Sequence, residues 1–300
     1  MTITIKFSDD IRHTYNSFKE ILRLDNYDDI IHIICCGNNL YNLPELPSSL
    51  IELECAYNKL SNLPELPNSL IELYCWNNNL SNLPELPNSL IRLFCDHNCL
   101  SSLPELPNSL QDLFCNNNKL ISLPELPNSL INLYCWNNNL SSLPELPNSL
   151  IELYCWNNIN LSSLPELPNS LIELECNNNN LSSLPELPNL LIELECNNNN
   201  LSSLPELPNS LVNLLCYNNS LSSLPELPNS LTEFVYKNNP IYEYIKTYFN
   251  GETKKYFEFN EKMKKLFINK IGNWYLDCKY NPKYLYCRKR LMKEYKELYG

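Results

Sequence analysis

Cysteine offers the most reactive side chain in this sequence, and 14 cysteines occur in 300 residues. Ten of them recur at intervals of twenty or twenty-one residues: Cys35, Cys55, Cys75, Cys95, Cys115, Cys135, Cys155, Cys176, Cys196 and Cys216. A thiolate could coordinate a metal or form a disulfide. Cysteine that alternates with leucine in a regular array is more typical of a small apolar core residue. We therefore predict that these thiols are buried, reduced and free of metal.

Few other residues are candidates for catalysis or metal binding: Asp96, His97, Cys99, Cys278, Cys287, His13 and His32. Only Asp96, His97 and Cys99 are close together in sequence, and this group fits simple variation within one repeat. With 4 glycines, the chain has no Gly-rich phosphate loop. We expect no catalytic residue, no bound metal and no cofactor, and hence a protein that is not an enzyme.

The cysteines belong to a repeat of twenty residues, which Leu70 begins as Leu-Ile-Glu-Leu-Tyr-Cys-Trp-Asn-Asn-Asn-Leu-Ser-Asn-Leu-Pro-Glu-Leu-Pro-Asn-Ser. We number the repeat positions from one at Leu70. The Asn at position nine marks eleven copies: Asn38, Asn58, Asn78, Asn98, Asn118, Asn138, Asn158, Asn179, Asn199, Asn219 and Asn239. Ten copies of Leu-Pro-Glu-Leu-Pro hold 20 of the 22 prolines. Because proline disrupts helices, this regular array excludes a bundle of long helices.

Positions one to eleven read Leu-x-x-Leu-x-Cys-x-x-Asn-x-Leu, so residues 30–241 resemble the leucine-rich repeat superfamily. The short repeat and its Leu-Pro-x-Leu-Pro half are most similar to bacterial secreted effectors, and giant DNA viruses also encode such arrays. The resemblance implies a repeat solenoid whose parallel strands line a concave face. Effectors of this type often carry a ubiquitin-ligase domain after the repeats. Only about sixty residues follow here, and neither tail cysteine begins a Cys-x-Asp pattern, so that activity is not carried over.

The residue types within one repeat predict its local structure. Alternation at positions three to five predicts a short strand, and the Leu and Cys side chains at positions one, four, six, eleven, fourteen and seventeen should point inward. Asn78, at position nine, lies where the chain must leave the strand, and its short amide side chain can bond the backbone and tolerate a left-handed conformation. Leu83 and Leu86 each precede a proline, which predicts an extended or polyproline return leg on the convex side.

The two ends of the chain lack the repeat and predict caps. In residues 1–29 we expect a strand over residues 2–7 and then a helix, with Ser8 as its N-cap. The apolar face of that helix would consist of Ile11, Tyr15, Phe18 and Leu22. In residues 242–300 the spacing of apolar residues predicts a helix that ends at Asn281-Pro282, followed by another from Lys283 to Leu298. We therefore expect helical caps at both ends of the solenoid.

Charge is unevenly divided along the chain. Residues 30–241 hold 4 basic and 21 acidic side chains, whereas residues 242–300 hold 14 basic and 7 acidic ones. A repeat segment with a net charge of −17 repels phosphate, so we expect no nucleic acid there. No apolar run reaches the ~18 residues of a membrane span, and the first residues lack the layout of a secretion signal. We expect a monomer in the cytoplasm, which would be the host cytoplasm for a viral protein.

The concave face carries the most informative surface residues. Five adjacent repeats have an aromatic residue at position five, three have Trp at position seven, and glutamates follow at positions three and five. The predicted partner-binding residues are Tyr74, Trp76, Phe94, Phe114, Tyr134, Trp136, Tyr154, Trp156, Glu173, Glu175, Glu193 and Glu195. Large aromatic patches usually mark contact sites. Our hypothesis is a scaffold for a protein partner whose basic residues flank an apolar centre.

Three other interpretations remain open. The aromatic residues could serve sheet packing alone, because stacked rings stabilise neighbouring strands. The chain could be an adaptor whose basic tail recruits a second complex, such as a ubiquitin-ligase component. Aromatic, Asn and carboxylate side chains also suit a carbohydrate ligand.

One repeat contains an extra residue. Ile159 and Asn160 occupy the place of the single residue that stands at position ten elsewhere. Because Leu161 has to regain its place in the core, we predict a local bulge between Asn158 and Leu161, with the stack of strands continuing on both sides.

Overall fold

The computed structural model describes residues 2–8 and 11–280. The chain divides into two compact units, Met1–Ile241 and Tyr242–Gly300. The first unit contains the repeats and the second is helical where it is described. The two units are treated separately below.

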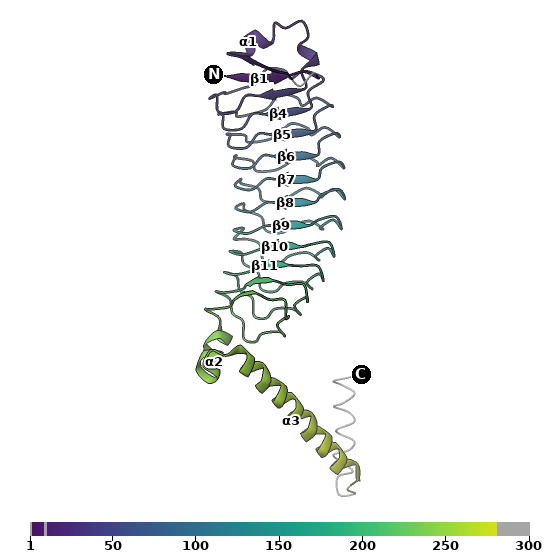
Figure 1. The fold of residues 1–300 in the computed structure, drawn as a ribbon, viewed down its shortest axis with the longest axis vertical. Helices are drawn as coiled ribbons and strands as arrows, with labels where there is room; N and C mark the ends of the chain where they lie inside the picture. Colours follow the sequence, from purple (N-terminus) through teal and green to yellow (C-terminus); the bar gives the residue numbers. More distant parts are fainter. Residues whose placement is uncertain (1, 9–10, 281–300) are drawn as a thin grey trace. The chain divides into compact units, whose positions relative to one another are not determined.

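The first unit is built on one sheet of thirteen strands, whose order follows the chain except at the N-terminal end. The parallel strands are β3 (His32–Ile34), β4 (Glu52–Glu54), β5 (Glu72–Tyr74), β6 (Arg92–Phe94), β7 (Asp112–Phe114), β8 (Asn132–Tyr134), β9 (Glu152–Tyr154), β10 (Glu173–Glu175), β11 (Glu193–Glu195), β12 (Asn213–Leu215) and β13 (Glu233–Val235). Figure 1 shows these strands stacked in chain order. Each pairs in register with the same repeat positions in the next copy, as Leu93 does with Leu113. The predicted parallel-strand solenoid is confirmed.

Alternation within each strand separates a buried face from an open one. In β5, Leu73 is fully buried whereas Glu72 and Tyr74 are half-buried on the concave side. Leu at positions one, four and eleven is fully buried in the central repeats, and so is Cys at position six. The prediction that the ten regularly spaced cysteines belong to the core is therefore confirmed.

The Asn at position nine forms a buried hydrogen-bonded array, which we call the asparagine ladder. Asn138 is 5% exposed, and its Nδ2 donates to the carbonyl oxygens of Cys115 and Cys135, both at 3.1 Å. Its Oδ1 accepts from the backbone N–H of Leu120 at 3.0 Å. Each copy of this side chain thus satisfies buried backbone groups of two adjacent coils.

The left-handed conformation occurs at position eight rather than at position nine. Asn77 and Asn137, both at position eight, have φ values of 51° and 53°. In the central repeats of the described chain, the residue at position nine never has a positive φ. The physical reason is that the position-nine amide is directed into the ladder, while position eight makes the turn out of the strand.

The return leg is irregular, with no helix or strand in any described Leu-Pro-Glu-Leu-Pro segment. Leu83 is buried as predicted, but Leu86 is only half-buried and the following Pro87 is buried instead. Ser129, at position twenty, then donates a hydrogen bond of 2.5 Å to the carbonyl of Leu110 in the preceding coil. The prediction for Leu86 was wrong because the turn before the next strand directs the proline ring inward.

The N-terminal cap is mostly β-structure. Strand β1 (Ile3–Lys6) pairs antiparallel with β3 and with β2 (Arg12–Tyr15). The helix predicted to begin after Ser8 is therefore wrong, because residues 12–15 form a strand. Helical structure is limited to one turn, α1 (Phe18–Ile21), with Ser17 at its N-cap, and the 3-10 turn η1 (Tyr27–Asp29).

The inserted residue is accommodated as predicted. Ile159 is 72% exposed in a turn, and the flanking strands β9 and β10 stay in register. The Leu161 N–H donates to the carbonyl of Asn158 at 2.8 Å. The Oδ1 of Asn179 accepts instead from the Asn158 N–H at 2.6 Å. The insertion therefore alters one rung of the asparagine ladder and leaves the stack continuous.

The second unit begins within helix α2 (Pro240–Phe249), which a left-handed Asn250-Gly251 turn separates from α3 (Thr253–Tyr280). Aromatic rings connect the two helices, since Phe249 lies 5.7 Å from Tyr256 and 5.5 Å from Phe259 between centroids. The helix predicted from Lys283 to Leu298 lies outside the described residues. Among the helices that are described, none has the length and apolarity needed to cross a membrane.

The asparagine ladder predicts a large difference between two adjacent residues. Replacing Asn138 with Ala leaves the buried N–H of Leu120 without its side-chain acceptor. This should lower the free energy of unfolding by about 2 kcal/mol or more. Replacing the exposed Asn139 with Ala should change it by no more than about 0.5 kcal/mol. Equal effects in urea unfolding of the two variants would contradict the role of the ladder.

Deletion of Ile159 should be neutral or stabilising. The deletion restores the regular repeat, removes an exposed apolar side chain, and lets Leu161 reach the Oδ1 of Asn179. The melting temperature of the deletion variant measures this directly. A large decrease would mean that the inserted turn itself stabilises the solenoid.

Candidate functional site

Five half-buried rings run side by side along the concave face, and we call them the aromatic row: Tyr74, Phe94, Phe114, Tyr134 and Tyr154. Successive ring centroids lie 4.7, 4.4, 4.2 and 4.4 Å apart. Three of the four contacts are stacked, and the contact of Phe114 with Tyr134 is edge-to-face at 62°. Each ring is therefore in contact with the ring on the adjacent coil of the row.

The tryptophans lie beside the aromatic row at the ends of the strands. Trp136 and Trp156 stack with centroids 4.3 Å apart and an interplanar angle of 7°. Trp76 is separate from this pair and contacts Tyr57 edge-to-face at 4.3 Å. The structure thus brings Trp136 and Trp156 together with the row but divides the three predicted tryptophans into two groups.

Tyrosine hydroxyls in the row are fixed by carboxylates at position three. Tyr74 donates to Glu72 at 2.6 Å, Tyr154 donates to Glu173 at 2.5 Å, and Tyr134 donates to Glu152. Burial and the neighbouring carboxylate together raise the pKa of each of these three hydroxyls. The tyrosines are therefore neutral donors with fixed orientations.

Glutamates without a cationic partner follow the aromatic row toward the C-terminal end of the sheet. The side chains of Glu175, Glu193 and Glu195 make no hydrogen bond or ion pair within the described chain, and the Glu173 side chain accepts a hydrogen bond from Tyr154. Burial raises the pKa of Glu175 to about 7, with further contributions from Glu195, Glu193 and Glu173. We call these four residues the acidic patch.

Two amides at position seven lie next in line after Trp156. Asn177 and Asn197 each have a buried Oδ1 that accepts no hydrogen bond within the described protein. Asn197 as a whole is 3% exposed. This end of the concave face is thus rich in acceptors and poor in donors.

The opposite end of the row carries a group that sequence reasoning missed. His32 lies on β3, and its Nε2 is 3.0 Å from Glu54 Oε1 and 3.5 Å from Glu52 Oε1. These residues stand 20 and 22 positions apart in the sequence. The repeat register could have revealed them, because His32 and Glu52 share position three of adjacent coils.

Glu52 has charged neighbours of both signs. Burial raises its pKa, with smaller contributions from Glu72 and Glu54, while His32 and Lys6 act in the opposite direction. At this end of the row, His32 and Lys6 therefore partly compensate the negative charge of Glu52. The acidic patch has no such cation within the described chain.

The other sequence candidates whose side chains are described form no reactive centre, while the Cys278 side chain and Cys287 lie outside the described part of the chain. Burial raises the pKa of the Cys135 thiol to about 12, so it is neither a thiolate nucleophile nor a ready metal ligand. His97 Nδ1 lies 2.9 Å from Asp96 Oδ2. Within the described chain, Cys99 does not join them in a cluster of three or more metal-binding side chains.

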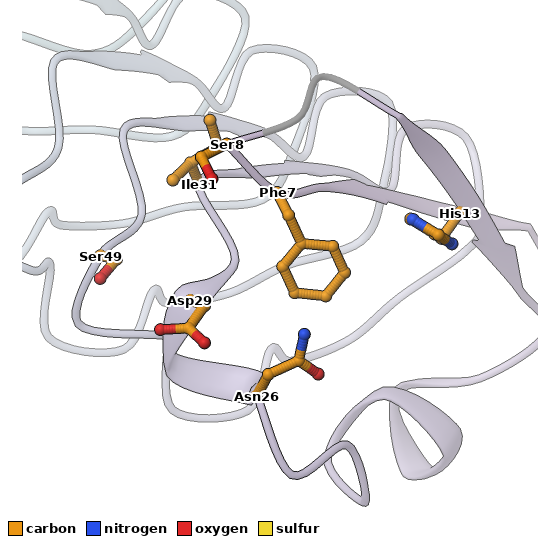
Figure 2. Close-up of a pocket in the computed structure, with 7 residues that line it drawn as sticks. All are labelled: Phe7, Ser8, His13, Asn26, Asp29, Ile31 and Ser49. Atoms are coloured by element: carbon orange, nitrogen blue, oxygen red, sulfur yellow. The ribbon is translucent and has the colours of Figure 1, made fainter.

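Two surface hollows lie away from the aromatic row. Figure 2 shows a pocket in the N-terminal cap, with the Phe7 ring beside Asn26 and Asp29. The His13 ring meets Phe7 edge-to-face at 5.5 Å. A groove on the return-leg surface is lined by three successive Leu-Pro-Glu-Leu-Pro-Asn segments, which include Glu166, Glu186 and Glu206. The N-terminal pocket also contains Ser8 and Ser49, but within the described residues no hydrogen bond joins either hydroxyl to His13 or Asp29.

The chain is similar to solved structures of leucine-rich repeat proteins. YopM from Yersinia enterocolitica is 39% identical, with a TM-score of 0.50, and the match covers 69% of this chain. This chain spans 56% of the length of that YopM chain. No protein-family model and no curated protein sequence matches.

Two further matches show the fold alone. A chain of the octameric complex of Latrophilin 3, Unc5D and the leucine-rich repeat protein FLRT2 is 22% identical, with a TM-score of 0.54 over 69% of this chain and 81% of that one. The Toll–Spatzle complex of Drosophila gives 21% identity and a TM-score of 0.55 over 70% of this chain and 34% of that one. Together with the repeat motif and the parallel-strand solenoid, these matches show that the chain has the leucine-rich repeat fold.

Proposed function

We propose that this protein is a non-enzymatic scaffold that binds a protein partner on its concave face. The observation that carries the proposal is the aromatic row with the Trp136–Trp156 pair beside it. Rings on five consecutive coils form one continuous aromatic strip along the concave face. Trp and Tyr dominate the energetics of protein interfaces, and rings that are already stacked lose little entropy on binding.

The charge around the strip supports a partner with basic residues. The acidic patch lies directly after Tyr154, and its carboxylates have no cation within the described chain. Lys or Arg side chains of a partner would relieve the mutual repulsion of these carboxylates. They could also donate hydrogen bonds to acceptors at the exposed edge of this region. At the other end, His32 and Lys6 already offset Glu52. We therefore infer that the partner places its apolar residues on the aromatic row and its basic residues over the acidic patch.

Similar solved structures are consistent with this function. FLRT2 occurs in a complex with other proteins, and Toll occurs in a complex with Spatzle. The solenoid of this chain offers the same kind of extended sheet surface, and the residues on its concave side are its own.

The two other candidate functions have less support. Sugar rings stack on the faces of aromatic side chains, but the faces within the aromatic row are covered by neighbouring rings, which weighs against a carbohydrate ligand. The adaptor function rests on the basic residues 242–300 and their division into a separate unit. The adaptor function would be favoured if the full chain captures a second set of proteins that a chain without residues 242–300 does not capture.

A double substitution tests the binding surface. Replacing Trp136 and Trp156 with Ala should leave the solenoid folded, because neither side chain is part of the Leu and Cys core. Partner binding should weaken by about 2 kcal/mol or more if these residues are hot spots. The measurement is affinity capture from host extract followed by titration of the captured partner against both proteins.

A matched control removes an aromatic residue outside the concave strip. Tyr41 is 66% exposed and contacts Lys59 rather than the aromatic row. The Tyr41→Ala variant should capture the same proteins as the wild type. If the double variant also captures them unchanged while its circular dichroism is native, the rings serve sheet packing alone.

The acidic patch predicts a pH-dependent effect on stability. A carboxyl whose pKa is raised by folding from 4.5 to about 7 stabilises the unfolded state increasingly as the pH rises through that range. Replacing Glu175 with Gln should therefore raise the melting temperature relative to wild type more at pH 8 than at pH 5. Glu186→Gln, on the exposed return leg, should show no such difference. A Glu175→Gln effect of equal size at both pH values would contradict the repulsion.

A further inference from the structure

We propose that His32, Glu52 and Glu54 form a zinc(II) site on the concave face of the first two coils. One donor atom from each side chain can be chosen so that all three lie within 4.8 Å of one another. Among the described residues, no other group of three or more His, Cys, Asp or Glu side chains meets this criterion. The site would bind a metal that the regular repeats, with their buried thiols, have no means to hold.

The sheet holds the three donors in place. His32 on β3 is the register partner of Glu52 on β4, so their side chains lie on the same face. Glu54 follows Glu52 by two residues and therefore shares that face as well. Strand β3 is itself held between β4 and β1, which limits its movement. Both metal-binding strands are thus rigid elements rather than loops.

The distances suit tetrahedral coordination. Zinc binds imidazole nitrogen and carboxylate oxygen at about 2.0–2.2 Å, which places two tetrahedral ligands about 3.3 Å apart. The Nε2 of His32 lies 3.0 Å from Glu54 Oε1 and 3.5 Å from Glu52 Oε1, on either side of that value. Small rotations of the carboxylates would place all three donors around one ion.

The protein alone does not satisfy this group. Nε2 can carry a single proton and so donates one good hydrogen bond, yet two carboxylates are directed toward it. The His32 side chain is 9% exposed, and the two glutamates are 31% and 32% exposed. Zinc would displace the Nε2 proton and take its place as the common partner of both carboxylates.

The charged neighbours set a moderate affinity. Lys6 on β1 is the register partner of His32, and its positive charge disfavours zinc binding. Glu72 on β5 is the register partner of Glu52, and its negative charge favours zinc binding. Arg92 lies 3.0 Å from Glu72 and reduces that contribution. The balance of these groups with the two glutamates leaves a net negative environment.

The donor set favours zinc over the hard cations. Ca²⁺ and Mg²⁺ take oxygen ligands almost entirely, whereas a buried imidazole with two carboxylates is a zinc-type set. Three protein ligands leave a fourth position toward the open concave face, as in sites that bind water or an external ligand. The occupant of that position would lie next to Tyr74, at the start of the aromatic row.

The test is calorimetric titration of the tag-free, chelator-treated full chain with zinc chloride. Wild type should bind one zinc ion at this site and show a higher melting temperature with zinc than with EDTA. His32→Gln and Glu54→Gln should each weaken zinc binding at least about tenfold and abolish the thermal shift. His97→Gln is the matched control, because His97 has a single carboxylate neighbour in Asp96. It should bind zinc like wild type.

X-ray absorption distinguishes this site from zinc held by cysteines. The proposal predicts a first shell of nitrogen and oxygen only, and a sulfur shell at about 2.3 Å would overturn it. Absence of zinc binding by wild type, or unchanged binding by a natively folded His32→Gln protein, would also overturn it and leave a cross-strand His–Glu ion pair. Circular dichroism of each variant, supported by the conservative Glu54→Gln change, separates loss of metal from loss of fold.

Discussion

The register between neighbouring coils is the constraint on which every surface feature of this protein depends. Asn at position nine enforces it, since one side chain donates to the Cys carbonyls of two coils and accepts the Leu N–H of the preceding coil. The amide can do this only when equivalent residues lie one above another. Residues twenty positions apart in the sequence thereby become nearest neighbours about 4.8 Å apart on the sheet.

Because the register is fixed, the residues at one repeat position of successive coils form a continuous strip along the sheet. Position five becomes the aromatic row because five consecutive coils carry a ring there, and its rings stack because the strand spacing is close to their stacking distance. Where position five changes to Glu175 and Glu195, burial raises the pKa of both carboxyls, and neighbouring glutamates add to the rise. At the first coils the register brings His32 to two glutamates. One constraint thus produces an apolar strip, an acidic patch and a group of metal-binding side chains.

The repeat made most of the solenoid predictable, because identical residues recur at every strand, core and turn position. The errors occurred where geometry depends on more than that pattern. The helical spacing from Ile11 to Leu22 was misleading because pairing with β1 draws Arg12–Tyr15 into the sheet. The inward turn of Pro87 depends on the conformation of the return leg. The group around His32 could not be found from closeness in sequence, because its members lie on two coils and meet only through the strand register.

The central claim is that the concave side, and not the return-leg side, meets the partner. A photoreactive benzoyl-phenylalanine placed at Asn132, beside the aromatic row, or at Glu145, on the return leg, tests it most directly. After irradiation in host extract, the account predicts a discrete crosslinked species from position 132 and none from position 145. Crosslinking from position 145 alone, or equally from both positions, would contradict it.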